Sequence, residues 1–197
     1  MRKKTLSNRD EKILLLLQQF DFLNRDQINK YFNLGKVCNT NRVLRNLSEY
    51  LLNIREGYQT IYYLSQAGRT YVDCQKVRKK GSHVKHIVMR NQFWLFYNCP
   101  KDWQNEVKIS NGNCSVVTDA MFTRNGFKYF LEVDNLQTMK ANRDKITRYK
   151  DLMTSLLQQF GYIPTLVWLT TTELRKKQLE EACRGLKCLV YTMNDIK

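Results

Sequence analysis

The sequence predicts an α/β protein (α+β) built from two parts of different character. Apolar residues recur at helical spacing through the first 50 residues, whereas strands alternate with helices beyond residue 100. An Asn-Gly pair at 125–126 lies between two apolar runs and marks a tight hairpin. The chain has 197 residues, 43% of them hydrophobic, which is enough for one large core or two small ones.

The first part begins with three expected helices. Ser7 and Asp10 resemble a capping box ahead of an apolar helix, and Asn24 offers a second helix start of the same kind. The segment 33–36 contains a glycine, as the turn of a helix-turn-helix requires. A third helix is expected to start near Cys38–Asn39 and to bury a stripe of valine and leucine.

A β-hairpin is expected to follow the third helix. Strands over Leu51–Arg55 and Thr60–Leu64 flank Glu56-Gly57-Tyr58-Gln59, a turn that contains glycine. Three helices followed by a hairpin are typical of a winged helix-turn-helix, so we expect such a domain over residues 1–75. The basic, glycine-containing segment 76–85 then predicts a linker.

The charge of the first part favours a polyanionic partner. Residues 1–100 carry 18 Lys/Arg against 7 Asp/Glu, a net +11 of the chain's +15. The outward face of the third helix offers side chains that bond base edges and phosphates. The candidate residues for binding double-stranded DNA are Lys36, Asn39, Thr40, Asn41, Arg42, Arg45, Arg55 and Tyr58. The alternative is a small packing module whose polar face is only solvated.

The second part, residues 86–197, predicts the element order αβββαβαβ with a mixed sheet. The expected elements are a helix over His86–Asn98, strands over Trp103–Ser110, Ser115–Thr123 and Phe127–Asp134, a helix over Thr138–Phe160, a strand over Pro164–Thr170, a helix over Thr172–Arg184 and a strand over Leu186–Tyr191. This order resembles that of PD-(D/E)xK nuclease-like domains.

The Asn125-Gly126 turn predicts the register of its two strands. If Arg124 pairs with Phe127, Asp119 lies directly opposite Glu132, and Asp134 lies on the same face. The other face of these strands is expected to form a core from Val116, Ala120, Phe122, Tyr129, Leu131 and Val133. Carboxylates that face each other repel unless a cation or a shared proton offsets their charge.

Such a pair suits Mg²⁺ or Mn²⁺, with Asp119 and Glu132 as candidate metal ligands. The candidate catalytic residues are Asp119, Glu132, Asp134 and Lys145. Glu132-Val133-Asp134 lacks the lysine that completes the nuclease motif, and Lys140 or Lys145 could replace it from the next helix. The alternative is a structural ion network with Lys140, Lys145 or Arg148, in which no cofactor is bound.

Other classes of protein are disfavoured. The six cysteines include no CxxC pair and no cluster of zinc spacing, so we expect neither a zinc finger nor a disulfide framework. The longest apolar run, Ile13–Leu17, is far shorter than a membrane span, and no signal peptide is evident. We therefore expect a cytoplasmic protein with no membrane partner.

The chain resembles the replication-relaxation family of Gram-positive plasmids and mobile elements. The resemblance rests on Tyr62-Tyr63-Leu64-Ser65-Gln66-Ala67-Gly68-Arg69, Trp103-Gln-Asn-Glu106, Thr118-Asp119, Phe130-Leu131-Glu132-Val133-Asp134, Lys145 and Tyr149. The chain departs from the family pattern at Thr118, where the family has proline, and at Asn135-Leu136, where it has arginine and glycine.

The resemblance implies a DNA-binding protein of a plasmid, phage or conjugative element. Its role would lie in replication and relaxation or their regulation, and its second domain would be nuclease-like. Because the nuclease motif is incomplete, we expect that this domain does not cleave DNA. Its further partners would be a second copy of the chain, in a homodimer, and other replication or transfer proteins. One alternative is an active endonuclease that depends on a divalent metal. Another is a winged-helix transcription regulator.

Overall fold

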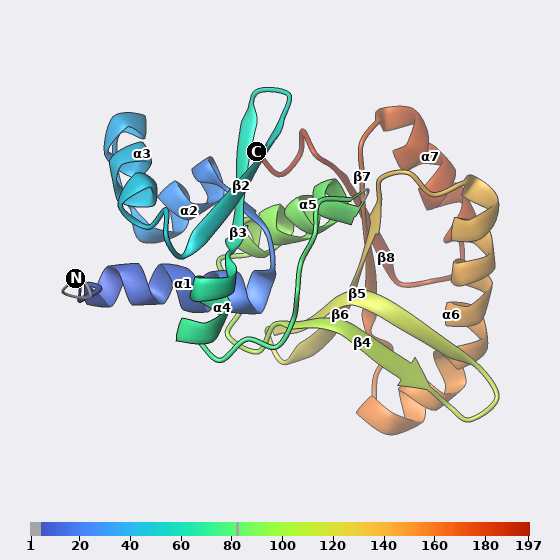
Figure 1. Cartoon of the computed structure of the whole chain (residues 1–197). Helices are drawn as coiled ribbons and strands as arrows, with labels where there is room; N and C mark the ends of the chain where they lie inside the picture. Colours follow the sequence, from blue (N-terminus) through green and yellow to red (C-terminus); the bar gives the residue numbers. More distant parts are fainter. Residues whose placement is uncertain (1–4, 82) are drawn as a thin grey trace. The chain divides into compact units, whose positions relative to one another are not determined.

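The computed structural model describes residues 5–81 and 83–197 (Figure 1). The chain divides into two compact units, Met1–Asn91 and Gln92–Lys197, and the division falls inside helix α5 (His83–Phe96). Two parts of the expected domain plan lie outside the described residues: positions 1–4 of the first domain and position 82 of the linker.

The first unit contains the three expected helices in the expected order. They are α1 (Asn8–Phe20), α2 (Arg25–Phe32) and α3 (Val37–Asn46), and a fourth short helix, α4, covers Gln66–Tyr71. Both predicted caps are present, because Ser7 accepts a hydrogen bond from the Asp10 amide and Asn24 forms a capping box. Polar side chains therefore fix where the first two helices begin.

A three-stranded antiparallel sheet completes the helical unit. The hairpin strands β2 (Leu51–Glu56) and β3 (Gln59–Leu64) pair from Leu51 and Leu64 down to the turn. The two-residue strand β1 (Leu23–Asn24) adds to β3, so that the strand order is β1-β3-β2. The sequence did not predict β1, because two residues carry no period of their own.

The core of the first unit includes the start of α5. Val84, Ile87 and Val88 form a buried cluster with Phe22 and with the hairpin residues Ile54 and Ile61. This contact explains why α5 begins at His83, three residues earlier than expected, within the segment predicted as a linker. Burial of apolar area stabilises each such side chain by about 1.5–3 kcal/mol.

The second unit contains the predicted mixed sheet. Its strands are β4 (Gln104–Ser110), β5 (Ser115–Arg124), β6 (Phe127–Asp134), β7 (Thr165–Thr170) and β8 (Cys188–Thr192). They lie in the order β4-β5-β6-β7-β8. The first three are antiparallel, and β7 and β8 run parallel to β6 and to each other. The predicted α/β architecture of this part is confirmed.

Both faces of this sheet are covered. Helices α6 (Met139–Phe160) and α7 (Glu173–Ala182) pack against one face (Figure 1) through a buried cluster that includes Tyr149, Trp168 and Leu179. Aromatic rings cover the other face, among them Phe93 of α5 and Phe122 of β5, whose centroids lie 6.3 Å apart. The sheet is therefore a central layer, as α/β proteins require.

The Asn125-Gly126 turn sets the predicted register. Arg124 pairs with Phe127, and the ladder continues in this register to Ala120 and Leu131. One part of the predicted core is wrong, because Val116 packs with the α6 cluster and not with Phe122. The neighbouring β4-β5 pair is irregular near this point: Glu106 has a φ of 55°, and the ladder omits Glu106 and Asp119 while keeping the same register on either side.

Candidate functional site

Helix α3 presents a polar, basic face in the first unit. Arg42 and Arg45 are exposed and Asn41 is half-buried. A guanidinium nitrogen of Arg42 donates to the side-chain oxygen of Asn39 at 2.8 Å, and the Asn39 amide donates to the Leu34 carbonyl at 2.8 Å. Asn39 therefore connects the turn before α3 to a basic side chain on the helix.

Thr40 does not belong to this face. Its side chain is 0% exposed, and its hydroxyl donates to the Lys36 carbonyl at 3.4 Å. The prediction that Thr40 contacts DNA is therefore wrong. Thr40 precedes Val43, Leu44 and Leu47 by three, four and seven residues, which is the spacing of a buried helical stripe. That spacing is the signal that could have placed Thr40 in the core.

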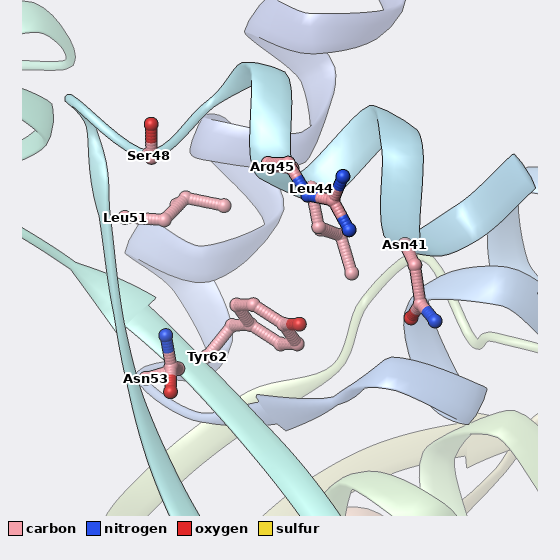
Figure 2. A pocket seen from close by; sticks show the side chains of 7 residues that line it. All are labelled: Asn41, Leu44, Arg45, Ser48, Leu51, Asn53 and Tyr62. Atoms are coloured by element: carbon pink, nitrogen blue, oxygen red, sulfur yellow. The ribbon is translucent and has the colours of Figure 1, made fainter. Parts of the chain in front are cut away.

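The other candidates of the first unit are accessible. Lys36 is the exposed N-cap residue of α3, where its side chain forms no capping hydrogen bond. Arg55 is exposed on β2, and Tyr58 is 100% exposed at the tip of the hairpin. Between α3 and the hairpin strands lies a hollow of about 290 Å³ (Figure 2). The first unit thus has three accessible features that a binding partner could contact: the polar face of α3, the tip of the hairpin and the hollow between them.

The acidic residues of the second unit meet on the side of the sheet that α6 covers. Asp119 accepts a hydrogen bond from the Val133 amide at 2.7 Å, and its negative charge acts on Glu132. The structure therefore brings the two predicted ligands within electrostatic reach of each other. The ladder between β5 and β6 ends one residue before these two acids, at Ala120 and Leu131.

Glu132 is 1% exposed and has two protein partners on α6. One oxygen accepts from the Lys145 ammonium, and the other accepts from the Tyr149 hydroxyl at 2.6 Å. Burial, together with the charge of Asp119, raises the pKa of Glu132 to about 8 against the opposing effect of Lys145. Burial also raises the pKa of Tyr149, so its phenol remains a donor.

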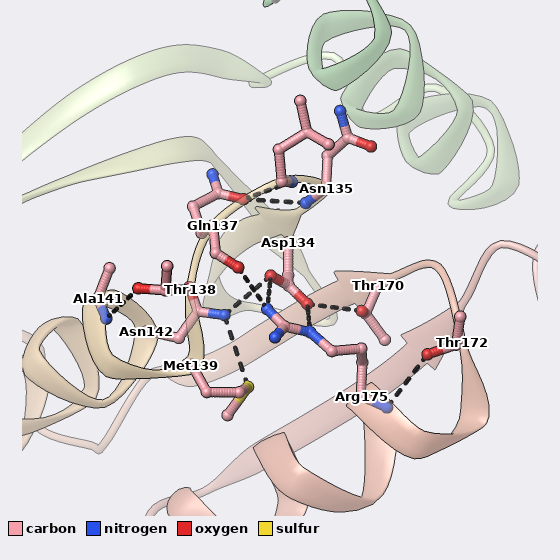
Figure 3. Close-up of polar contacts among 11 residues, drawn as sticks. Asp134, Asn135, Gln137, Thr138, Met139, Ala141, Asn142, Thr170, Thr172 and Arg175 are labelled. Carbon is pink, nitrogen blue, oxygen red and sulfur yellow. Dashed lines mark hydrogen bonds and ion pairs between the residues drawn. The ribbon is translucent and has the colours of Figure 1, made fainter.

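Asp134 is held in a separate network (Figure 3). Arg175 of α7 approaches both carboxylate oxygens, with its Nε donating at 2.8 Å. The Thr170 hydroxyl donates at 2.7 Å and the Asn142 amide at 2.9 Å. Burial alone would raise the pKa of Asp134, but these hydrogen bonds outweigh it and lower the pKa. Asp134 therefore links β6 to β7, α6 and α7.

Asp134 and Lys145 thus occupy different networks, although both were predicted as catalytic residues. Lys145 lies with Glu132 and Tyr149, whereas Asp134 lies with Arg175. Neither Lys140 nor Arg148, the other basic residues considered, forms an ion pair with these carboxylates among the described contacts. Arg175 was not among the predicted site residues, because it lies 41 residues from Asp134 and no local pattern in the sequence signals their contact.

The arrangement does not fit a divalent metal. Both oxygens of Glu132 and both oxygens of Asp134 already accept hydrogen bonds from protein groups. Within residues 5–81 and 83–197, no three His, Cys, Asp or Glu side chains lie together as a metal ion would require. Mg²⁺ needs near-octahedral oxygen ligands, and here the Lys145 ammonium occupies one of the carboxylate oxygens.

The fold and the site define an α/β protein of two units. The first carries the basic face of α3 and the hairpin, and the second holds the buried carboxyl groups of Glu132 and Asp134 in two separate hydrogen-bond networks. The chain belongs to the replication-relaxation family, whose model matches residues 14–166. No curated protein matches the sequence. Within the described residues, no helix has both the length and the apolar character that crossing a membrane demands.

Three solved structures show a weak likeness to the chain. The protein VC1899 from Vibrio cholerae is 12% identical, with a TM-score of 0.39 over 95% of this chain and 54% of its own. Can2 from Sulfobacillus thermosulfidooxidans, solved with cyclic tetra-adenylate, is 11% identical, with a TM-score of 0.35 over 96% and 53%. The restriction endonuclease FokI is 13% identical, with a TM-score of 0.35 over 98% and 44%.

The chain spans about half the length of these structures. Because all three TM-scores are low, the likenesses define neither the fold nor the chemistry of this protein.

Proposed function

We propose that the protein binds double-stranded DNA with a preference for sequence and serves a plasmid, phage or conjugative element in replication and relaxation or their regulation. The observation that carries the proposal is the exposed face of α3, on which Arg42 and Arg45 stand beside Asn41. Membership of the replication-relaxation family supports the same role.

Residues 1–75 would act as a winged helix. Helix α3 would enter a major groove, where arginine and asparagine side chains can form paired hydrogen bonds with guanine and adenine. Arg55 and Tyr58 of the hairpin would contact the backbone, because both are exposed and lie at or near its tip. The net +11 over residues 1–100 would supply attraction to phosphates that is independent of sequence.

Residues 86–197 would form a nuclease-like domain that has no cleavage activity, joined to the winged helix by the segment 76–85. The support is that protein groups already occupy both oxygens of Glu132, one held by Lys145 and the other by Tyr149. The domain would then serve as a platform for DNA, for a second copy of the chain or for other replication or transfer proteins.

DNA binding is tested by gel shifts of the full chain over a series of salt concentrations. We expect steep salt dependence, and we expect Arg42→Ala and Arg45→Ala each to weaken binding and to reduce the salt slope by about 1. Lys177→Ala, which removes one exposed charge from α7, is the matched control and should bind like the parent. Equal binding by all four proteins would remove the α3 face from the interface.

An active endonuclease is the second candidate, favoured by the closeness of Asp119 to Glu132 and by Lys145 beside them. Plasmid nicking with Mg²⁺, Mn²⁺ or EDTA separates the two functions. We expect the parent, Asp119→Ala and Glu132→Ala to show the same background in every buffer. Metal-dependent nicking by the parent that both variants lose would instead establish the endonuclease.

A further inference from the structure

The hollow in the first unit has two walls from different elements (Figure 2). Asn41, Leu44 and Arg45 of α3 form one wall, and the other is formed by the hairpin. The remaining lining residues are Ser48, Leu51, Asn53 and Tyr62. The Tyr62 ring lies between the helix residues and Asn53 of β2 (Figure 2). A volume of about 290 Å³ is close to the lower end of small-molecule sites, roughly 300 Å³.

The polar groups around the hollow have capacity for a ligand. In the described part of the chain, no hydrogen bond joins the side chains of Asn41, Ser48 or Asn53 to another protein group. Each amide offers both donors and an acceptor. Burial raises the pKa of Tyr62, with nearby Arg25 acting in the opposite direction, so its phenol remains protonated.

The residues that line the hollow favour one chemical class of ligand over another. Leu44 and Leu51 are buried apolar residues, and Tyr62 adds a half-buried aromatic ring. Only one cationic group, Arg45, lines the described hollow. A phosphate is bound by several cations or backbone amides, whereas a base stacks on aromatic and apolar surfaces and bonds through its edge. These features favour a planar heterocycle.

A base pair within a stacked duplex cannot enter a space with walls on two sides, but a single unpaired base can. We infer that the hollow between α3 and the β2-β3 hairpin binds one unpaired nucleobase, read by the amides of Asn41 and Asn53 above the apolar floor. The inference rests on the proposed DNA binding and adds a preference to it. The protein favours DNA in which a base is already released from pairing, since unpairing costs a few kcal/mol.

The test compares three labelled DNAs by fluorescence polarisation with the full chain. One is a matched duplex, the second carries a single unpaired adenine, and the third carries an unpaired abasic nucleotide at the same place. The abasic duplex has the same extra phosphate and the same flexibility but no base. We expect the unpaired adenine to bind about tenfold more tightly than either of the others, a difference of about 1.4 kcal/mol.

Two substitutions on β2 test whether the preference for the unpaired adenine arises in the hollow. Asn53→Trp fills the hollow, and because the Asn53 side chain is exposed and has no described hydrogen bond, the change leaves the β2-β3 ladder intact. Leu52→Trp places the same side chain on the adjacent exposed residue, which does not line the hollow. We expect Asn53→Trp to abolish the preference for adenine, Leu52→Trp to keep it, and both to bind the matched duplex like the parent.

Equal affinity for the adenine and abasic duplexes would overturn the inference and leave the proposed DNA binding in place. A preference that survives in Asn53→Trp would also overturn it, because the base would then be bound elsewhere. Failure to bind any of the three DNAs would overturn both the inference and the proposed function.

Discussion

Tyr149 donates its hydroxyl hydrogen to Glu132 across 2.6 Å, beneath α6 and out of contact with solvent. The other oxygen of Glu132 accepts from Lys145, one helical turn before Tyr149. A lysine and a tyrosine four residues apart share one face of a helix, so both reach the same carboxyl group. The Lys145…Tyr149 spacing that resembles the family therefore has a structural purpose, which is to hold a buried acid on β6.

Glu132→Gln is expected to remove a dependence of stability on pH. The pKa of Glu132 is about 8 in the folded protein and about 4.5 in an unfolded chain, so the folded state binds the extra proton between these values. The free energy of unfolding therefore falls as pH rises from about 5 to 8, by about 1.4 kcal/mol per pH unit from this group. Urea unfolding of both proteins at several pH values measures the difference.

The glutamine variant mimics the neutral carboxyl group and should lose this slope. Below pH 5 the two proteins should have similar stability, and at pH 8 the variant should be the more stable. Parallel stability profiles across this range would show that Glu132 ionises as it does in water.

Arg175→Met is expected to lower the free energy of unfolding by about 3–5 kcal/mol. Asp134 is buried, and Arg175 contacts both of its carboxylate oxygens. Without the guanidinium group, the hydrogen bonds from Thr170 and Asn142 do not compensate the buried negative charge. Urea unfolding at pH 7 measures the loss. Lys177→Met, on the exposed side of the same helix, is the matched control and should change stability by less than about 0.5 kcal/mol.

The lowered pKa of Asp134 determines how the free energy of unfolding changes with pH. Its ionised form stabilises the fold above pH 4, and this contribution is lost as pH falls through the folded-state pKa. The parent should therefore lose stability in acid more steeply than Arg175→Met. If Arg175→Met were as tolerant as Lys177→Met, the pair would be only a surface contact.

Local signals in the sequence predicted much of the fold. The Asn125-Gly126 turn sets a ladder register by geometry over a few residues, so the pairing down to Ala120 and Leu131 could be predicted. The helix caps at Ser7 and Asn24 are local for the same reason. These features need no knowledge of what packs against them.

Long-range contacts could not be predicted in the same way. Arg175 reaches Asp134 only because α7 folds back over the end of β6, and no spacing in the sequence encodes that approach. The predicted alternation also fails along β5, since Val116 packs in the α6 cluster, and the adjacent ladder omits Glu106 and Asp119 between Asn105 and Val107. The candidate acids of the second unit and one of their partners, Lys145, could therefore be predicted from the sequence, whereas Arg175 could not.

Gly68→Ala is expected to destabilise the first unit by about 1–3 kcal/mol. A Cβ at Gly68 would lie 2.1 Å from the Tyr50 carbonyl oxygen, which is a backbone atom and cannot rotate away. The close approach allows α4 to pack beside the chain that enters β2. Thermal unfolding of the full chain measures the effect.

Gly81→Ala is the matched control, because among the described residues, its chain neighbours aside, no atom lies within 4 Å of a Cβ at that position. It should leave the melting temperature nearly unchanged. Equal melting temperatures for the two variants would mean that α4 does not approach Tyr50 as closely as described.

Thr40→Lys and Asn41→Lys are expected to have opposite consequences, although the residues are adjacent on α3. Thr40 is fully buried, so a lysine there would place an unpaired charge in the core and lower the free energy of unfolding by about 3 kcal/mol or more. Asn41 is half-buried beside the open hollow, where a lysine can reach water and should cost less than about 0.5 kcal/mol. Urea unfolding of the two variants distinguishes a buried stripe from a binding face. Equal stability would return Thr40 to the DNA-binding face and would mean that α3 is rotated about its axis.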